Sequence, residues 1–298
     1  MDADRDTPLW ETVTDRIRAA EGNDFTPRAR QAVGGGCINQ AYTLDGEGRR
    51  YFVKLNDAAR LAMFEAEAAG LAELRAAEAI RVPRPVATGT AGGQAFLVME
   101  HLALGGRGNG ARFGEALAAL HRRTADRYGW QRDNTIGATP QPNAWQDDWV
   151  VFWREQRLGF QLDLAARRGA GSRLIERGHD LLDRLPAFFT DYRPQPSLLH
   201  GDLWGGNMDT DTEGRPVIFD PAVYYGDREA DLAMTELFGG PGGDFYRAYD
   251  AAWTLDPGYG LRKTLYNLYH ILNHYNLFGG GYAGQAERMT DRLLAELR

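Results

Sequence analysis

The chain has 298 residues, a formal net charge of −7 at pH 7, and hydrophobic and charged fractions of 43% and 25%. These fractions are typical of a soluble globular protein, and the acidic balance argues against a general binder of nucleic acid or of anionic membranes. No uncharged run approaches the ~18 residues of a membrane span, and the first residues lack the apolar segment of a secretory signal. The single cysteine, Cys37, excludes an internal disulfide framework and a cysteine-based zinc site. We therefore expect a cytoplasmic protein.

The N-terminal third of the chain predicts a small sheet with helices around it. The spacing of Leu9, Val13 and Ile17 after Pro8 predicts an N-terminal helix. The other elements expected here are strands at 28–33, 40–44, 51–55, 86–89 and 95–100, and an alanine-rich helix at 58–79.

After His101 the pattern becomes mostly helical, and the glycines at 105–110 predict a connection between two lobes. We expect an α+β, bilobal fold: a nucleotide-binding lobe over 1–102, with a small antiparallel sheet and one key helix, and a mostly helical lobe over 103–298 that carries the catalytic loop and the acceptor site. Ligands favour the interface between such lobes. The helices expected in the second lobe span 112–124, 144–168, 173–190, 229–237, 244–254, 260–278 and 285–297.

One stretch of the second lobe carries the strongest functional signal. Asp202 is followed by Asn207, and Asp220 stands at the end of a later apolar run. Phosphoryl transfer from ATP requires a carboxylate that orients the attacking hydroxyl and accepts its proton, here Asp202. It also requires an amide oxygen and a second carboxylate that hold Mg²⁺, here Asn207 and Asp220. A hairpin with its turn at 209–215 would place the two ligands side by side. Ordinary turn residues are the alternative, which the spacing disfavours.

A glycine-rich loop in the first lobe fits the same chemistry. The glycines let backbone N–H groups approach phosphate oxygens closely. A simple glycine turn is the alternative, because the third glycine of the common nucleotide-binding pattern is absent. The loop comprises Gly34, Gly35, Gly36, Cys37 and Asn39.

Lys54 and Glu67 are expected to form an ion pair between a strand and a helix. Lys54 stands among apolar neighbours in mid-strand, where an unpaired lysine is unusual. Glu67 shares an apolar helical stripe with Phe64 and Leu71, and a carboxylate there is costly without a cation. Such a pair directs the lysine amine at the α- and β-phosphates of ATP. The alternative, an exposed position on an amphipathic helix, suits Glu65 better.

Together these motifs resemble those of the fructosamine/ketosamine-3-kinase family, within the aminoglycoside-phosphotransferase-like and protein-kinase-like superfamily. The resemblance covers nearly the whole chain. The tryptophan after His-Gly-Asp, the Trp-Gln-Asp-Asp-Trp run and the cysteine of the glycine loop are its narrower signals. The matching segments are 35–38, 52–56, 63–67, 82–85, 98–102, 145–149, 200–207, 219–221, 225–226 and 273–276.

The resemblance implies a protein-kinase-like fold and an enzyme that uses ATP and Mg²⁺ to phosphorylate the 3-hydroxyl of ketosamines. These are sugar adducts of small amines or of protein lysines, and the phosphate ester decomposes to free the amine, which amounts to deglycation and protein repair. It further implies that the backbone at Met99, Glu100, His101 and Leu102 holds the adenine. Pro221 replaces the Phe-Gly of protein kinases after the metal-binding aspartate, which agrees with a constitutively active small-molecule kinase.

The acceptor site is less sharply defined. Trp204, two residues after the expected base, would stack on a sugar ring or an amine-bearing chain. His274 is either a structural histidine or a sugar contact. Cys37, the single thiol, leaves open a monomer or a Cys37-linked dimer. It is either a small apolar residue of the loop or a redox-sensitive thiol whose oxidation would block nucleotide binding.

Trp145, Trp149 and Trp153 recur every four residues on the helix expected at 144–168. Core packing is the plainer interpretation for Trp149 and Trp153, whereas Trp145 is a candidate contact of the acceptor. Asp147 and Asp148 fall on other faces, where at least one would give the acceptor pocket an acidic rim.

Two other functions remain to be compared. A kinase of the same fold could act on an aminoglycoside, choline or a free sugar, since fold does not determine substrate. A catalytically inactive nucleotide-binding regulator is disfavoured, because every residue expected to do chemistry is present. Those residues are Lys54, Glu67, Asp202, Asn207 and Asp220.

Overall fold

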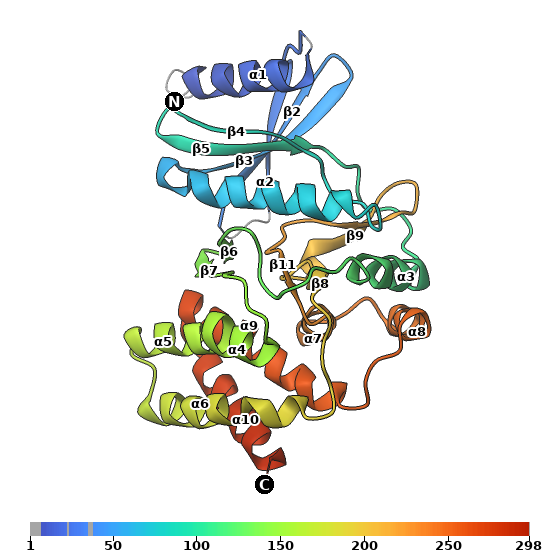
Figure 1. The fold of residues 1–298 in the computed structure, drawn as a ribbon. Coiled ribbons are helices and arrows are strands. Elements are labelled where there is room, and N and C mark those ends of the chain that lie inside the picture. Colours follow the sequence, from blue (N-terminus) through green and yellow to red (C-terminus); the bar gives the residue numbers. More distant parts are fainter. Residues whose placement is uncertain (1–6, 23, 35–37, 298) are drawn as a thin grey trace.

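The computed structural model describes residues 7–22, 24–34 and 38–297, which form two lobes stacked one above the other (Figure 1). The upper lobe contains an antiparallel sheet with the strand order β1-β2-β3-β5-β4. The lower lobe is mainly helical and carries short strand pairs at its boundary with the sheet. The α+β, bilobal, kinase-like architecture expected from the sequence is confirmed.

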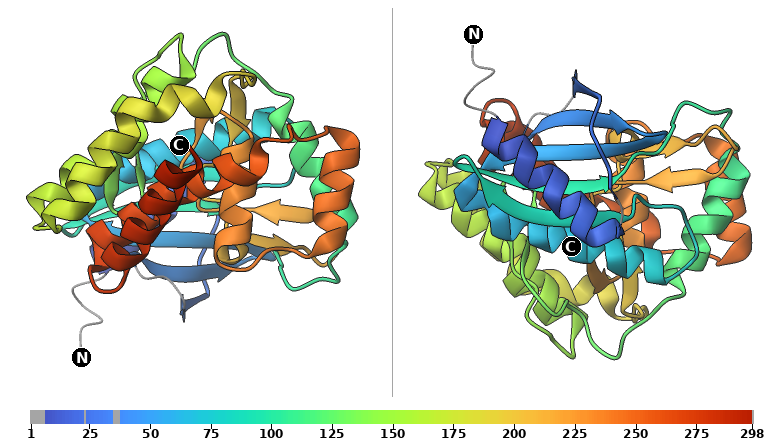
Figure 2. Two further views of the ribbon diagram at one scale, coloured as in Figure 1. Left: turned by 90° about the horizontal axis from the view of Figure 1, so that it is seen from below. Right: turned by 90° about the horizontal axis from the view of Figure 1, so that it is seen from above.

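The sheet of the upper lobe follows the predicted strands closely. Its two helices lie on opposite faces, and α1 runs obliquely across the sheet when the molecule is seen from above (Figure 2). The elements are α1 (Thr7–Glu21), β1 (Ala29–Val33), β2 (Gln40–Gly46), β3 (Arg49–Asp57), a 3-10 turn (Ala58–Arg60), α2 (Leu61–Ala76), β4 (Pro85–Ala91) and β5 (Gln94–Glu100).

Alternation along β3 divides its side chains between the two faces. Val53 and Leu55 are fully buried in the apolar cluster under α1. Lys54 therefore points to the other face, where α2 packs its buried Phe64 and Leu71 against the sheet. The strand thus directs one lysine toward the helix that carries Glu67.

The lower lobe contains the remaining elements. Its apolar core is continuous with α2, since Phe64 and Leu71 belong to the same buried cluster as the central helix α9. The helices are α3 (Gly110–His121), α4 (Trp149–Trp153), a π-helical turn (Arg154–Leu158), α5 (Gly159–Arg167), α6 (Ser172–Arg184), a 3-10 turn (Leu185–Phe189), a second 3-10 turn (Gly205–Asn207), α7 (Glu229–Leu237), α8 (Gly243–Ala252), α9 (Tyr259–Phe278) and α10 (Tyr282–Glu296). The strands are β6 (Asn134–Ile136), β7 (Thr139–Gln141), β8 (Ser197–Leu199), β9 (Met208–Thr210), β10 (Pro216–Ile218) and β11 (Tyr224–Gly226).

The prediction of one continuous helix over 144–168 is wrong. The helix begins only at Trp149, and a π-helical turn interrupts it. Asp148 is extended, and its carboxylate accepts a hydrogen bond from the Val151 N–H, so α4 begins only at Trp149. Gln146 instead exchanges backbone hydrogen bonds with Tyr128. Trp145 therefore does not share a helix with the later tryptophans. The predicted core role of Trp149 and Trp153 is confirmed by their burial.

No helix in the described part of the chain combines the length and apolar character needed to cross a membrane.

Candidate active site

A buried lysine joins the two lobes. The Lys54 Nζ lies 2.5 Å from Glu67 Oε1 on α2 and 2.5 Å from Asp220 Oδ1 of the lower lobe. The Lys54 side chain is only 8% exposed. Burial alone would lower the pKa of Lys54, but the two carboxylates raise it above its ordinary value, so the amine remains protonated. The predicted Lys54–Glu67 pair is present.

The catalytic loop follows the short buried strand β8. His200 is completely buried, its Nε2 donates to the Phe219 carbonyl at 2.8 Å, and its Nδ1 accepts from the Asp202 N–H at 3.2 Å. Burial lowers the pKa of His200, which agrees with a neutral ring. His200 thus orients the loop and connects Asp202 to the residue before Asp220.

Asp231 on α7 holds the same loop from below. Its carboxylate accepts the His200 N–H at 2.8 Å and the Gly201 N–H at 2.9 Å, and it also contacts the buried His121 at 3.1 Å. Gly201 has φ of +84°, and a Cβ there would lie 1.9 Å from the Ala222 carbonyl oxygen. Only glycine suits this position. The sequence analysis missed Asp231, because it stands beside Glu229 in the first turn of α7, where acidic residues are common.

Asn207 and Asp220 are adjacent, as predicted. The Asn207 Nδ2 donates to the Asp202 backbone oxygen at 2.9 Å and lies 3.5 Å from the Asp220 carbonyl oxygen. Asp220 has φ of +56°, a strained conformation for a residue with a side chain and one found mostly at functional sites.

The two side chains fit a divalent cation. In the described part of the chain no hydrogen bond engages the Asn207 Oδ1, and Lys54 contacts only one carboxylate oxygen of Asp220. Mg²⁺ is held by one or two carboxylates together with substrate phosphates rather than by an all-protein cage. Among the described residues, no cluster of three or more His, Cys, Asp or Glu is suited to a metal.

Asp202 lies beside these ligands, with one carboxylate oxygen 3.3 Å from the Asn207 Nδ2. Burial and then repulsion from Asp220 raise the pKa of Asp202 to about 7. A general base is most effective when its pKa lies near the working pH. The position and the pKa of Asp202 both suit proton abstraction from a hydroxyl group.

A hydrogen-bonded network of side-chain amides, those of Asn134, Gln141 and Asn143, holds the segment that follows Asp220. Asn134 Nδ2 donates to the Val223 carbonyl at 2.8 Å, and Gln141 Nε2 donates to the Ala222 carbonyl at 3.1 Å. The Asn134 Oδ1 in turn accepts from Gln141 and from Asn143, both at 2.9 Å. The β6–β7 hairpin, which the sequence analysis did not predict, therefore positions the backbone beside the metal ligand.

Arg157 closes this network from the π-helical turn. It is fully buried, its Nη2 donates to Asn143 Oδ1 at 2.6 Å, and its guanidinium lies 4.0 Å from the ring centroid of Tyr224. No carboxylate pairs with Arg157 in the described structure. Its charge is stabilised by carbonyl oxygens and aromatic faces instead.

The predicted nucleotide-binding segments are only partly described. Gly35, Gly36 and Cys37 lie outside the described residues, so their role and the Cys37-linked dimer stay predictions. Asn39 Oδ1 accepts from Asn56 Nδ2 at 2.8 Å, which ties the end of the glycine loop to β3.

The expected adenine-binding segment, residues 99–102, includes the last two residues of β5 and the two residues after it. Met99 and Glu100 lie in the strand, and the Glu100 N–H already donates to the Arg84 carbonyl at 2.8 Å. The His101 N–H likewise contacts the Arg50 carbonyl at 3.4 Å, whereas no backbone partner engages the Leu102 N–H among the described residues. Of these N–H groups, that of Leu102 is available to a base.

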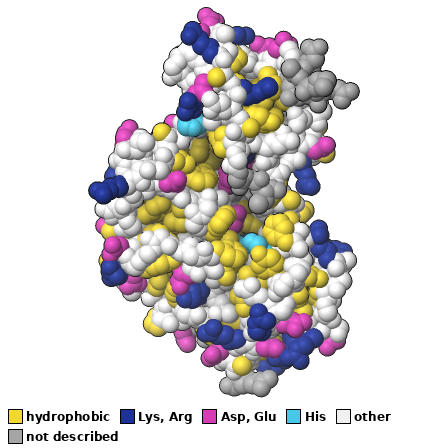
Figure 3. All heavy atoms as spheres, turned by 180° about the vertical axis from the view of Figure 1, so that it is seen from behind, with side chains coloured by type: hydrophobic (Ala, Val, Ile, Leu, Met, Phe, Trp, Pro, Cys, Tyr) yellow, Lys and Arg dark blue, Asp and Glu magenta, His cyan; other side chains and the backbone are white. Residues whose placement is uncertain are grey.

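An aromatic surface adjoins the catalytic loop. Trp204 is 40% exposed and meets Phe238 edge to face at 6.4 Å. Phe238 packs against His274 at 4.9 Å, and His274 packs against Tyr282 at 5.2 Å. Figure 3 shows hydrophobic side chains gathered around a histidine on the lower lobe. Trp204 and His274, both predicted as acceptor contacts, therefore belong to one surface.

The other predicted acceptor residues have different neighbours. Asp147 is exposed and pairs with Arg127 at 2.6 Å, Asp148 caps α4, and Trp145 lies 6.1 Å from the ring of Tyr225. No contact in the described structure joins these residues to Asp202. Their acceptor role stays a prediction without such support.

The fold and these side chains define a phosphotransferase of the protein-kinase-like class. The family model described as fructosamine kinase matches residues 9–296. The chain belongs to the fructosamine kinase family.

Individual relatives agree with this assignment. The chain is 51% identical over 290 residues to a probable ketoamine kinase of Synechocystis, covering 96% of this chain and 97% of the relative. It is 44% identical over 271 residues to the chloroplastic protein-ribulosamine 3-kinase of Arabidopsis thaliana, covering 90% and 83%.

Solved structures show the same fold. A putative fructosamine-3-kinase from Haemophilus somnus superposes with a TM-score of 0.87 at 30% identity, over 96% of this chain and 97% of that one. Aminoglycoside phosphotransferase APH(4)-Ia, in a ternary complex with AMP-PNP and hygromycin B, superposes with a TM-score of 0.62 at 15% identity, over 95% and 98%. This second likeness concerns the fold alone.

Proposed function

We propose that this protein transfers the γ-phosphoryl group of ATP to the 3-hydroxyl of a ketosamine and so starts its deglycation. The observation that carries the proposal is the position of Lys54 Nζ, 2.5 Å from Glu67 of the upper lobe and 2.5 Å from Asp220 of the lower lobe, which Asn207 in turn connects to Asp202. Membership of the fructosamine kinase family, over residues 9–296, supports the acceptor class.

The roles of the residues follow from their chemistry. Asp202 orients the acceptor hydroxyl and takes its proton, and Lys54 binds phosphate oxygens while Glu67 holds it in place. Asn207 and Asp220 would hold Mg²⁺, which neutralises charge on the phosphates when it is bound. The segment around Leu102 would hold the adenine, and the loop at 34–39 would cover the phosphates.

The acceptor would lie between Asp202 and the aromatic surface of Trp204, Phe238 and His274. A sugar ring presents C–H groups that pack on an indole face, and an amine-bearing chain gains a cation–π contact there. Such a surface suits a small ketosamine or the modified lysine of a glycated protein.

The first test is ATP consumption with Mg²⁺ against a panel of acceptors. The panel comprises fructose-, ribulose- and erythrulose-lysine, an aminoglycoside, choline and free sugars. We expect turnover on ketosamines, and we expect Asp202→Asn to lower kcat about 10²- to 10⁴-fold, the usual contribution of a general base. ATP affinity, measured by titration, should change little.

Asp209→Asn provides the matched control, since Asp209 lies on β9 and its carboxylate, among the described residues, accepts a hydrogen bond only from the Thr210 N–H. Activity retained in Asp202→Asn would disprove the assignment of the base. Turnover on a different acceptor alone would keep the kinase and reject the ketosamine.

A further inference from the structure

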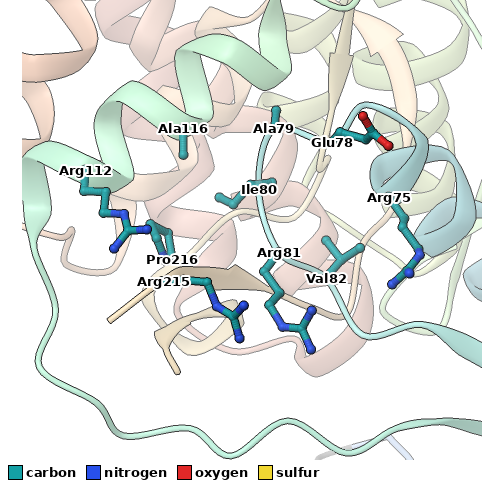
Figure 4. A pocket seen from close by; sticks show the side chains of 10 residues that line it. All are labelled: Arg75, Glu78, Ala79, Ile80, Arg81, Val82, Arg112, Ala116, Arg215 and Pro216. Atoms are coloured by element: carbon teal, nitrogen blue, oxygen red, sulfur yellow. The ribbon is translucent and has the colours of Figure 1, made fainter. Parts of the chain in front are cut away.

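A hollow of about 290 Å³ lies where the two lobes meet, outside the site described above. Its walls come from the connection between α2 and β4, from α3, and from the turn between β9 and β10 (Figure 4). None of the residues assigned to nucleotide, metal or acceptor lines it. The lining residues are Arg75, Glu78, Ala79, Ile80, Arg81, Val82, Arg112, Ala116, Arg215 and Pro216.

The lining of this hollow is positively charged, whereas the whole chain carries a negative net charge. Four guanidinium groups face one carboxylate, that of Glu78, in a protein whose net charge is −7. The arginines come from three separate segments, so the fold and not a basic run in the sequence brings them to one hollow, where Arg81 and Arg215 lie side by side and Arg75 and Arg112 lie toward its two ends (Figure 4). Arginines gathered at one site are typical of phosphate and carboxylate recognition.

Two of the arginines have no carboxylate partner among the described residues. The Arg75 side chain makes no hydrogen bond or ion pair there, and Arg112 donates only to the Gly214 carbonyl at 3.1 Å. Each guanidinium has five N–H donors, so most donors of this pair are free to bind a ligand.

The other two arginines, Arg81 and Arg215, are paired with carboxylates but use only some of their N–H donors. Arg81 donates Nη2 to Glu100 at 2.5 Å, and its buried Nε lies 3.8 Å from Asp211, which leaves Nη1 without a partner among the described residues. Arg215 contacts Asp211 at 2.7 Å and Glu213 at 3.2 Å. These carboxylates are not part of the lining, so they hold the two arginines without occupying the hollow.

The position of the hollow couples it to both lobes. Arg81 follows α2, yet its backbone exchanges hydrogen bonds with Pro216 and Ile218 of β10 at 3.3 and 3.0 Å. Ile80, Ala116 and Pro216 provide an apolar floor beneath the guanidiniums. A ligand in this hollow would therefore contact the N-lobe connection, α3 and β10 at the same time.

We propose that this hollow, the arginine pocket, binds a small phosphate-bearing anion and clamps the two lobes together. Its volume lies at the lower end of the range for small-molecule sites, about 300 to 1,000 Å³, which favours a compact ligand. Phosphate oxygens can accept from several arginines at once, and a dianion gains more from this lining than a single carboxylate does. Free phosphate and a phosphate ester share this chemistry.

The test measures binding while the active site is filled. The full-length protein is saturated with Mg²⁺ and a non-hydrolysable ATP analogue, and thermal stability is followed against inorganic phosphate or a hexose phosphate. Sodium chloride at equal ionic strength is the reference. The variant Arg75→Gln/Arg112→Gln removes the two arginines that have no carboxylate partner, so it leaves no buried carboxylate unpaired. The matched control, Arg167→Gln/Arg168→Gln, removes the same charge from the exposed end of α5.

We expect at least one of the two probes to raise the melting temperature of the wild type and of the control equally. In the Arg75→Gln/Arg112→Gln variant, the apparent Kd of the probe that stabilises the wild type should rise at least tenfold. The probe with the lower Kd identifies whether free phosphate or an ester is the ligand. Equal Kd values in all three proteins, or no shift with either probe, would overturn the proposal. Because no acceptor is present, the result does not depend on which compound the enzyme phosphorylates.

Discussion

Asp231 is the residue on which the conformation of the catalytic loop most depends. Its buried carboxylate accepts from two consecutive N–H groups of the loop and contacts His121. Burial alone would raise the pKa of Asp231, but the interactions with His121, His200 and Gly201 lower it below its ordinary value. The ionised form is therefore the one that the folded protein stabilises.

We expect Asp231→Asn to lower the free energy of unfolding by about 1–3 kcal/mol at pH 7, since an amide cannot accept all of these bonds. Because the folded pKa is depressed, the stabilisation is complete above the unfolded pKa of about 3.9 and is lost as the pH falls through the folded value. Urea unfolding at pH 7 and at about pH 3, below the unfolded pKa, should show that the difference in unfolding free energy between wild type and variant narrows at the lower pH. A difference independent of pH would contradict the role of the charge, and the exposed Asp163→Asn is the control.

The β6–β7 hairpin positions the segment after Asp220 through several residues together. It presents Asn134 and Gln141 to consecutive carbonyls of the segment after Asp220. The Ala222 N–H donates in turn to the His200 carbonyl at 2.8 Å. The hairpin, the metal-ligand segment and the catalytic loop are thus one hydrogen-bonded unit, which agrees with a permanently active conformation.

Asn134→Ala tests this unit. The change leaves the Val223 carbonyl without its partner and removes one of the two acceptors of Gln141 Nε2 and of Asn143 Nδ2, so we expect a stability loss of about 1–3 kcal/mol. Displacement of Asp220 should also lower kcat about tenfold and raise the Mg²⁺ concentration needed for half-maximal rate. Pro140→Ala, on the exposed side of the same hairpin, is the control. An unchanged Mg²⁺ requirement would show that the hairpin is merely structural.

The start of α4 offers a second test at this scale. Asp148 caps the helix through the Val151 N–H at 2.9 Å, so Asp148→Ala should cost about 1 kcal/mol of stability. If capping is its whole role, the KM for the acceptor should not change. A raised acceptor KM at unchanged stability would instead support the predicted acidic rim. Thermal unfolding and initial rates distinguish the two outcomes.

The molecule has two lobes that share one apolar core. Apolar side chains of α2 belong to the same buried cluster as those of α9, so relative motion of the lobes is restrained by packing as well as by the Lys54 pairs. A nucleotide bound between Lys54 and Asp220 would add contacts to both lobes and stabilise the complete fold.

We therefore expect ATP with Mg²⁺ to raise the free energy of unfolding by about 2.7 kcal/mol at a hundred times its Kd. Chelation of Mg²⁺ or the substitution Asp220→Asn should remove most of this gain, which differential scanning calorimetry can measure. An equal gain in Asp220→Asn would contradict its assignment as a metal ligand.

Local sequence patterns were sufficient to predict much of the fold and of the candidate site. Alternation along β3 correctly separated Lys54 from Val53, and helical periodicity correctly separated Glu67 from the exposed Glu65. Both inferences rest on the cost of burying charge, which acts within one element. The helix expected at 144–168 failed because a capping side chain at Asp148 and backbone pairing of Gln146 override the periodicity of the tryptophans.

The chain by itself therefore determined the order of elements, the two lobes and the residue types that phosphoryl transfer needs, because spacing and burial are encoded locally. Only the tertiary structure decided which distant groups meet. Asn134 reaches Val223, Asp231 reaches the catalytic loop, and four arginines from three segments share one hollow. Such contacts depend on long-range packing, in which partners far apart in sequence satisfy one another's hydrogen bonds and charges, and no local periodicity specifies them.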